Sequence, residues 1–168
     1  MKKIVFITLG TQGNQFPRCL QMVEELIYKL HPNYDFVAQL GNTNYSSSVI
    51  KCLDFLSETE FEEYIAKADI IISHAGSGAL FGAIQRGKKC IAVARLKEYN
   101  EMLNNHQTEL VRKLTKEGYI LDGTYSIISA WNQLDEFIPR SNDFSCEISN
   151  KIDSLLKEWG VKSEKYSK

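Results

Sequence analysis

A histidine followed by four small residues forms the segment of this sequence best suited to chemistry, His74-Ala75-Gly76-Ser77-Gly78. It lies between an apolar run at residues 69–73 and a stretch with helical periodicity at residues 76–85. Small residues at a helix start let a ligand approach several backbone N–H groups at once, and the helix dipole adds partial positive charge. We therefore predict an anion site here, with His74 donating to a phosphate oxygen. A structural role for the histidine is the alternative.

A second loop of the same kind, Gly10-Thr11-Gln12-Gly13-Asn14, follows the apolar run at residues 4–9. Its glycines let the backbone turn sharply and expose N–H groups, and a helix start comes directly after it. The loop is therefore a second candidate for phosphate binding. A tight turn without any ligand would explain the same residues.

A third loop is rich in charges and amides. It runs from Arg95 to Glu101 and is followed by a polar segment at residues 104–109. Gln107 and Glu109 carry the planar polar groups that can hold vicinal hydroxyls, as sugar recognition requires. A solvated loop with an asparagine helix cap is the simpler alternative.

The histidine segment partly matches two other enzyme motifs but lacks residues that each of them requires. A dinucleotide fingerprint would need a third glycine where Phe81 stands, and an acidic residue within 91–96, which contains none. A nucleophile elbow at Ser77 would need an acid and then a histidine downstream, and His106 is the only later histidine. The chain is also short for that hydrolase fold, so the hydrolase is kept as a minor alternative.

Strands and helices that must position these loops alternate along the chain. Short apolar runs predict strands, at residues 4–9, 34–40, 49–53, 69–73, 90–94 and 119–121. Because these runs are continuously apolar and separated by helical segments, they predict one parallel sheet with helices on both faces. The fold class is therefore α/β, a single Rossmann-like domain over residues 1–160 with a polar tail at 161–168.

Helix boundaries are marked by their own signals. Pro17 suits a first helical turn, and Ser57 with Glu60 has the pattern of a capping box. Apolar residues at helical spacing predict further helices, one carrying Leu103, Leu110, Val111 and Leu114 and two more over 127–138 and 148–159. In such a fold ligands bind at the carboxyl ends of the strands, where all three candidate loops lie.

Composition fits one globular domain in a reducing compartment. The 168 residues are 43% hydrophobic and 24% charged, with a net charge of −1 that favours neither nucleic acid nor an anionic membrane. Membrane-spanning runs of about 20 apolar residues do not occur. The four cysteines have no metal-like or redox spacing, so we expect core residues in a cytoplasmic protein, at Cys19, Cys52, Cys90 and Cys146.

Together, three motifs resemble the glycosyltransferase family 28 C-terminal domain over about residues 3–122. The closest likeness is to PssE-type proteins of capsule and exopolysaccharide synthesis, with the C-terminal half of MurG as a single-chain relative and the catalytic subunit of the split UDP-GlcNAc transferase of the dolichol pathway as the eukaryotic counterpart. The resemblance is carried by Phe6-Ile7-Thr8-Leu9-Gly10-Thr11-Gln12, by His74-Ala75-Gly76-Ser77-Gly78, and by Arg95-x-Lys97-Glu98-Tyr99 with Asn105-His106-Gln107-x-Glu109-Leu110.

This resemblance implies half of a GT-B glycosyltransferase divided between two chains. This chain would bind a UDP-sugar donor, and a membrane-anchored partner subunit would supply the acceptor-side domain, the general base and recruitment to the cytoplasmic face of the membrane. The acceptor would be a lipid-linked sugar on polyprenyl diphosphate. Neither a metal nor a cofactor is expected, in keeping with a sequence that contains no Asp-x-Asp motif.

Residue roles follow from the same resemblance. His74 would contact a phosphate as the catalytic residue, and His106 with Gln107 would hold the donor sugar. The complete donor-binding set would be Gly10, Thr11, Gln12, Gly13, Gly76, Ser77, Gly78, Arg95, His106, Gln107 and Glu109.

Two positions depart from the family pattern. Relatives usually carry an acidic residue eight positions beyond the histidine, for the ribose hydroxyls, and this chain has Gly82 there. Ala94 stands where a proline is common. The first departure leaves a second hypothesis open, a non-catalytic nucleotide-binding or scaffold subunit of such a complex.

Overall fold

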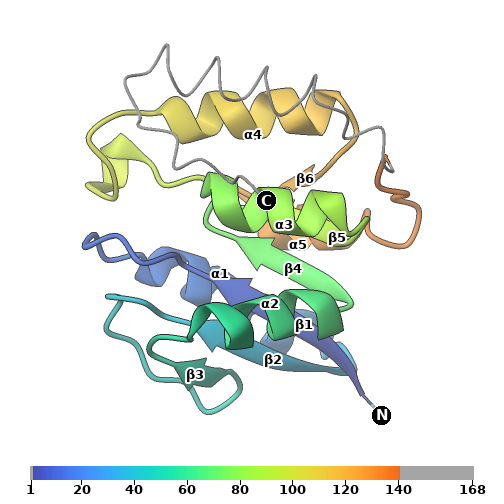
Figure 1. Ribbon diagram of the computed structural model, residues 1–168, viewed down its shortest axis with the longest axis horizontal. Helices are drawn as coiled ribbons and strands as arrows, with labels where there is room; N and C mark the ends of the chain where they lie inside the picture. The colour runs from blue at the N-terminus through green and yellow to red at the C-terminus, as the bar shows by residue number, and fades with distance from the viewer. Residues whose placement is uncertain (1, 141–168) are drawn as a thin grey trace.

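Six parallel strands form one sheet in the computed structural model, which describes residues 2–140 (Figure 1). The strands are β1 (Lys3–Thr8), β2 (Tyr34–Gln39), β3 (Lys51–Leu53), β4 (Ile70–Ser73), β5 (Lys89–Ala92) and β6 (Leu121–Asp122). Their order across the sheet is β3-β2-β1-β4-β5-β6. The predicted parallel α/β sheet is therefore confirmed.

The strand order places a topological switch point between β1 and β4. From β1 the chain runs outward through β2 to β3, and then returns to β4 on the other side of β1. Thr8 pairs with Ser73, so both strands end at the same level. The loops that leave these two strands diverge to opposite faces, which opens a crevice at the carboxyl edge, the usual ligand position in this topology.

Within residues 2–140, five α-helices cover both faces of the sheet, and Figure 1 shows α2, α3 and α4 on the side nearer the viewer. They are α1 (Pro17–Leu30), α2 (Glu58–Lys67), α3 (Ser77–Gln85), α4 (His106–Lys116) and α5 (Ile127–Trp131), with a 3-10 turn η1 (Lys97–Tyr99) before α4. Helices α1 and α5 pack with one hydrophobic cluster, and α2, α3 and α4 pack with another. Neighbouring residues of β1 alternate between these clusters, since Val5 and Ile7 join the first and Phe6 the second.

Sequence signals set several of the boundaries. Pro17 begins α1, and the capping box predicted for Ser57 and Glu60 is present at the start of α2. Gly87 after α3 and Gly118 after α4 have φ values of +61° and +79°, conformations that glycine adopts without strain.

Two predicted helices are shorter than their apolar patterns suggested. Leu103 lies before α4 and is 89% exposed, because the loop that leads into this helix continues to Asn105. Ile138 is 87% exposed and α5 ends at Trp131. Pro139 follows Ile138, and a residue before proline avoids the helical conformation.

The last strand of the sheet also differs from its prediction. Tyr119 and Ile120 are buried but precede β6, which begins at Leu121. The predicted helix at 148–159, the domain limit at 160, the tail at 161–168 and Cys146 lie outside the described residues.

The cysteines that the structure describes are unpaired and lie in or near the core, as predicted. Cys19 and Cys90 are fully buried, and burial raises the pKa of each thiol to about 12, which keeps them protonated and unreactive. Within residues 2–140, no helix combines the length and the apolar character that crossing a bilayer would require.

Candidate functional site

The histidine segment and the first glycine loop meet in the crevice between β1 and β4. The His74 backbone N–H donates to the Thr8 carbonyl at 3.0 Å, and the ring Nδ1 lies 3.0 Å from the same oxygen. Because a carbonyl oxygen can only accept, Nδ1 carries the hydrogen in this contact. His74 is thus fixed to the end of β1 by both its backbone and its ring.

Two glycines enclose the His74 ring. A Cβ atom at Gly10 would lie 2.5 Å from Nε2 of the ring, and a Cβ at Gly76 only 2.2 Å from it. Gly10 also has φ +73°, a left-handed conformation that other residues rarely adopt. Glycine is therefore required at both positions for the histidine to fit between the two loops.

Burial keeps His74 neutral. Desolvation and the nearby positive charge of Arg95 lower the pKa of His74 to about 4, although the Thr8 carbonyl favours the charged form. With the hydrogen on Nδ1, the neutral ring has no N–H at Nε2 to offer a phosphate oxygen. The structure gives His74 a packing role, and its contact with a phosphate stays a prediction.

Helix α3 begins immediately behind this histidine with no side-chain cap. Ala75 has φ +63°, rare for a residue with a side chain, and this sharp turn lets the helix start at Ser77. Gly76 is the N-cap residue, and glycine has no side chain that could cap the N–H groups of the first turn. The N–H groups of Ser77 and Gly78 thus belong to a helix start that can receive an anion.

The first glycine loop is supported from the neighbouring β2 loop. The Asn42 side-chain amide donates to the carbonyls of Thr11 and Gln12 at 2.9 and 3.2 Å. A Cβ at Gly41 would overlap the Gly10 carbonyl oxygen at 2.0 Å, so this contact also requires glycine. Thr11, Gln12 and Gly13 are exposed at the tip of a loop that is held at its base.

Arg95 is a buried cation without a full set of partners. It is 1% exposed, and one N–H of its guanidinium donates to the Leu9 carbonyl at 2.9 Å. The guanidinium also lies over the Phe16 ring at 5.2 Å, while Nε and Nη1 have no hydrogen-bond partner. Burial lowers the pKa of Arg95 and Glu101 opposes the change, but an arginine stays protonated at neutral pH. A positive charge therefore lies beneath the glycine loop with donors unused.

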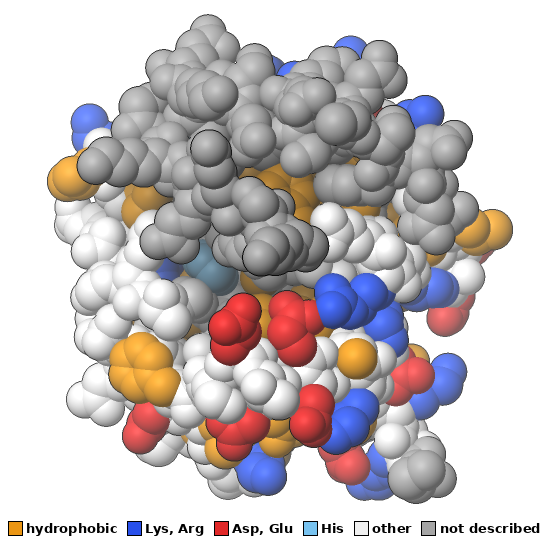
Figure 2. Space-filling model, in the orientation of Figure 1, with side chains coloured by type: hydrophobic (Ala, Val, Ile, Leu, Met, Phe, Trp, Pro, Cys, Tyr) orange, Lys and Arg blue, Asp and Glu red, His pale blue; other side chains and the backbone are white. Residues whose placement is uncertain are grey.

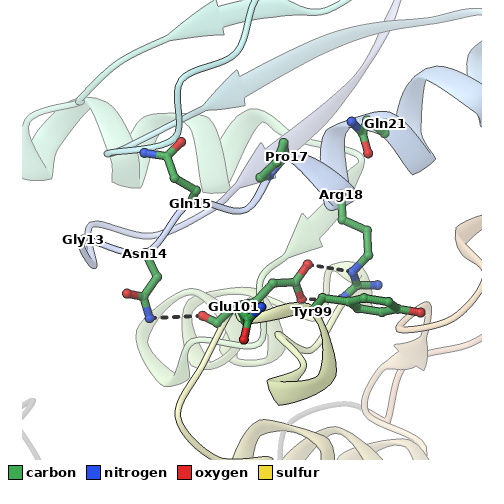
Figure 3. A pocket seen from close by; sticks show the side chains of 9 residues that line it. Gly13, Asn14, Gln15, Pro17, Arg18, Gln21, Tyr99 and Glu101 are labelled. Atoms are coloured by element: carbon green, nitrogen blue, oxygen red, sulfur yellow. Dashed lines mark hydrogen bonds and ion pairs between the residues drawn. The ribbon is translucent and has the colours of Figure 1, made fainter.

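A partly buried ion pair that the sequence did not single out joins three loops (Figure 3). Arg18 donates to both carboxylate oxygens of Glu101, at 2.8 and 2.9 Å. Its remaining N–H groups reach the carbonyls of Ala94 and Thr124, at 2.8 and 2.6 Å. A positive charge in the first turn of a helix is disfavoured by the helix dipole. The position of Arg18 directly after Pro17 could therefore have indicated that a carboxylate from another segment compensates its charge.

Residues predicted to hold the donor sugar lie at the start of α4. Gln107 accepts a hydrogen bond from the Arg95 backbone N–H at 2.9 Å, which ties the two predicted donor-binding residues together. His106 is the first residue of the helix and is half-buried, whereas Glu109 is exposed. The structure thus connects Gln107 to the site through Arg95 and leaves Glu109 on the surface.

Gly82 has room for a side chain. The nearest atoms to a Cβ at this position are Nη1 of Arg86 at 3.7 Å and Cγ2 of Ile65 at 3.9 Å, both ordinary contacts. Arg86 also forms an ion pair with Glu62 of α2. Figure 2 shows acidic side chains gathered over α2 with basic side chains beside them. The arginine that a side chain at Gly82 would approach is therefore already paired with the carboxylate of Glu62.

Comparison with known proteins gives a family and a set of relatives. Residues 4–149 match the model of the family described as glycosyltransferase family 28 C-terminal domain. The UDP-N-acetylglucosamine transferase subunit ALG13 of Homo sapiens is 29% identical over 143 residues, which are 78% of this chain and 12% of that protein. The chain thus spans about an eighth of the length of this relative.

Solved structures show the same fold. The NMR solution structure of ALG13 superposes with a TM-score of 0.61 at 19% identity, covering 93% of this chain and 96% of that one. The glycosyltransferase SsfS6 from Streptomyces sp. SF2575, solved in complex with thymidine diphosphate, gives a TM-score of 0.56 at 16% identity and covers 95% of this chain but 38% of its own. These likenesses confirm the predicted fold class, one α/β domain equivalent to half of a GT-B glycosyltransferase.

We expect Gly76→Ala to destabilise the protein, because the new Cβ overlaps the His74 ring. Forcing an extra methyl group into a packed site costs about 1–3 kcal/mol, to be measured as the free energy of urea-induced unfolding. Gly13→Ala is the matched control, since no atom lies within 4 Å of the added Cβ. Equal stability of both variants would contradict the enclosure of His74 by the glycines.

The low pKa of His74 predicts a loss of stability in acid. Because the folded-state pKa of about 4 lies below the ordinary histidine value of 6.5, the unfolded chain takes up a proton first as the pH falls. The contribution of His74 to the free energy of unfolding is thus complete above pH 6.5 and declines between pH 6.5 and about 4. An NMR titration of the His74 ring checks this directly, with His74→Asn to assign its signals; a midpoint near 6.5 would refute it.

Removing either member of the Arg18–Glu101 pair should be costly, because it leaves the other charge unpaired and largely shielded from water. We expect Arg18→Met and Glu101→Gln each to lower the free energy of unfolding by about 3 kcal/mol, with a double variant that loses clearly less than the sum. The exposed pair Glu25–Lys29 on α1 is the control and should contribute almost nothing. Additive losses at Arg18 and Glu101 would show that the pair does not act as a unit.

Proposed function

Because the chain belongs to the glycosyltransferase family 28 C-terminal domain family, we propose that it binds a UDP-sugar and supplies it for transfer to a lipid-linked sugar acceptor. A partner subunit, anchored to the cytoplasmic face of the membrane, would supply the acceptor-side domain. Two findings support this division. The chain has the fold of half a GT-B enzyme, and its human relative is named as a subunit of a UDP-N-acetylglucosamine transferase.

The observation that carries the proposal is a group of possible anion donors at the switch point. The uncapped start of α3 and the glycine loop after β1 lie on either side of His74. Arg95 adds a buried positive charge under the same loop, with Nε and Nη1 unsatisfied. A diphosphate provides the negative charge and the acceptor oxygens that such a group of donors lacks.

The chemistry expected of this half is electrostatic. Transfer of the sugar leaves negative charge on the departing nucleoside diphosphate, and donors fixed in advance around it stabilise that charge as it develops. The first-turn amides of α3 would do this directly, while Arg95 would act through its field from beneath the loop. His106 and Gln107 at the start of α4 would hold the sugar, with Gln107 fixed by the Arg95 backbone.

The general base is proposed to belong to the partner. His74 is neutral, and its free nitrogen, Nε2, is enclosed by Gly10 and Gly76. That position suits a residue that holds the two loops together better than one that removes a proton from an acceptor hydroxyl.

UDP-N-acetylglucosamine is the first donor to test, because the relatives are named for it. The role in capsule or exopolysaccharide synthesis that the sequence motifs implied, the polyprenyl-diphosphate acceptor and the cytoplasmic location remain proposals of the same kind. A non-catalytic nucleotide-binding subunit is the rival, favoured by Gly82 in the position where relatives carry an acid for the ribose.

Calorimetric titration of the chain together with its partner tests the proposal. We expect UDP and UDP-N-acetylglucosamine to bind and uridine to bind far more weakly, since the diphosphate makes the main contacts. Gly82→Glu should raise the affinity for UDP by about tenfold, because a hydrogen bond to a charged group is worth about 1.5–3 kcal/mol. Absence of UDP binding to this complex would contradict the proposed function.

Gly82→Ala is the matched control for this substitution. It adds the Cβ without a carboxylate, so the affinity for UDP should not change, while the helix gains up to about 1 kcal/mol of stability. An assay of sugar transfer by the same two-protein complex tests the rival hypothesis of a non-catalytic subunit. If the pair binds UDP but transfers no sugar to a polyprenyl-diphosphate-linked acceptor, the non-catalytic subunit is the correct interpretation.

A further inference from the structure

The loop after β2 is bonded to the glycine loop through side chains of both. Asn42 donates from its side-chain amide to the carbonyls of Thr11 and Gln12, at 2.9 and 3.2 Å. In the other direction, the Gln15 side chain donates to the Asn42 carbonyl at 2.6 Å and accepts from the Asn44 backbone N–H at 2.8 Å. These hydrogen bonds fix the two loops to each other.

The backbone on both sides of Asn42 is itself held. The Gly41 N–H donates to the Asp54 carbonyl at 2.7 Å, just beyond β3. Thr43 is buried, and its hydroxyl accepts from the Phe16 backbone N–H at 3.1 Å. Asn42 is exposed, so its side chain is not part of the core. Its amide thus extends from a fixed base, and the hydrogen bonds that the structure gives it go to the glycine loop.

The two carbonyls that point to Asn42 set the direction of two N–H groups. A trans peptide unit is planar, and its C=O and N–H point in opposite directions. The Thr11 carbonyl shares its peptide unit with the N–H of Gln12, and the Gln12 carbonyl shares the next unit with the N–H of Gly13. Within residues 2–140 no peptide bond is cis. Both N–H groups therefore point away from Asn42.

These two N–H groups are free to receive a ligand. Gln12 and Gly13 are exposed, and within the part of the chain that the structure describes neither N–H has an acceptor. Because both carbonyls converge on one amide nitrogen, the two N–H groups point to the same side of the loop. Successive N–H groups with a shared direction form a concavity that binds anions.

The ends of the glycine loop are held from opposite sides. The Asn14 side chain donates to the Glu101 carbonyl at 3.1 Å, and Figure 3 shows Asn14 and Gln15 leaving the loop in opposite directions. Across the sheet, β4 and the start of α3 lie on the other side of β1 from β2. N–H groups turned away from the β2 loop therefore point toward the side on which α3 begins.

We propose that Asn42 is a positioning residue, which turns the N–H groups of Gln12 and Gly13 toward the phosphate oxygens of the donor. This inference rests on the glycosyltransferase function proposed above. Without Asn42 the two peptide units can rotate, and a carbonyl oxygen, which can only accept, then takes the place of a donor. The Asn42 side chain acts through the loop and needs no contact with the donor itself.

A ¹H–¹⁵N NMR titration with UDP, on the chain together with its partner, tests the inference. In the parent protein we expect downfield shifts at the amides of Gln12 and Gly13, because each forms a hydrogen bond to a phosphate oxygen. The first two residues of α3, Ser77 and Gly78, should shift as well. In Asn42→Ala the shifts at the start of α3 should persist, whereas those in the glycine loop should be largely lost.

The affinity for UDP gives a second measurement. Asn42→Ala should weaken binding about tenfold, which corresponds to the loss of one or two hydrogen bonds. Asn42→Asp should weaken it further, because a carboxylate cannot donate and repels the two carbonyls.

Asn44→Ala and Asn44→Asp are the matched controls. Asn44 is an exposed asparagine two positions away, and within the described residues it uses its backbone N–H, not its side chain. Both controls should bind UDP as the parent does. All four variants should keep a urea midpoint close to that of the parent, since both asparagines are exposed.

Three results would overturn the inference. One is a set of UDP shifts at the start of α3 with none at Gln12 and Gly13 in the parent, which leaves the proposed function standing. Another is an Asn42→Ala variant that binds UDP as the parent does. The third is equal weakening by Asn42→Ala and Asn44→Ala, which would make the effect a general one of the β2 loop. If UDP shifts no amide at either place, the proposed function fails and the inference fails with it.

Discussion

The ion pair between Arg18 and Glu101 is the interaction on which the carboxyl edge of this protein depends. Arg18 lies in the first turn of α1, and its N–H groups reach Glu101 and the carbonyls of Ala94 and Thr124. The segments after β1, β5 and β6 are therefore fixed to one side chain. A half-buried arginine with all its donors satisfied can hold loops that have little hydrophobic contact of their own, because breaking any one bond leaves its charge less well solvated.

His74 performs the equivalent task on the other side of the crevice. Its ring fills the space between the loops after β1 and β4, and two glycines make that space available. A charged ring could not remain there, since burial and the field of Arg95 both favour the neutral form. The donors that would face a diphosphate are thus held by packing, and such preorganised donors need little rearrangement when charge develops in a transition state.

The order of strands and helices could be predicted from the sequence because apolar runs and caps are local signals. The Ser57–Glu60 capping box and the turn at Gly87 follow directly from neighbouring residues. Leu103 misled the prediction because a single apolar residue at helical spacing does not reveal whether the chain has already entered the helix. Three candidate loops were also predictable, since strand ends and glycines mark them.

Contacts between distant segments could not be predicted in the same way. Arg18 and Glu101 are 83 positions apart, and the residues around either one do not indicate that the other is its partner. The glycines at 10 and 76 could be identified as permissive positions, but not as the two walls around a histidine. Arg95 was expected to contact the donor, whereas the fold turns its side chain inward to Leu9 and Phe16.

Two arginines on the same edge of the sheet therefore have different roles. Arg18 is neutralised by Glu101, so it holds the loops together and offers no uncompensated charge to a ligand. Arg95 has no carboxylate within hydrogen-bonding distance among the described residues, and its unused donors make the neighbouring crevice favourable for an anion. The anionic part of a ligand would therefore favour the crevice near Arg95 over the edge near Arg18, because only the first has positive charge that no carboxylate compensates.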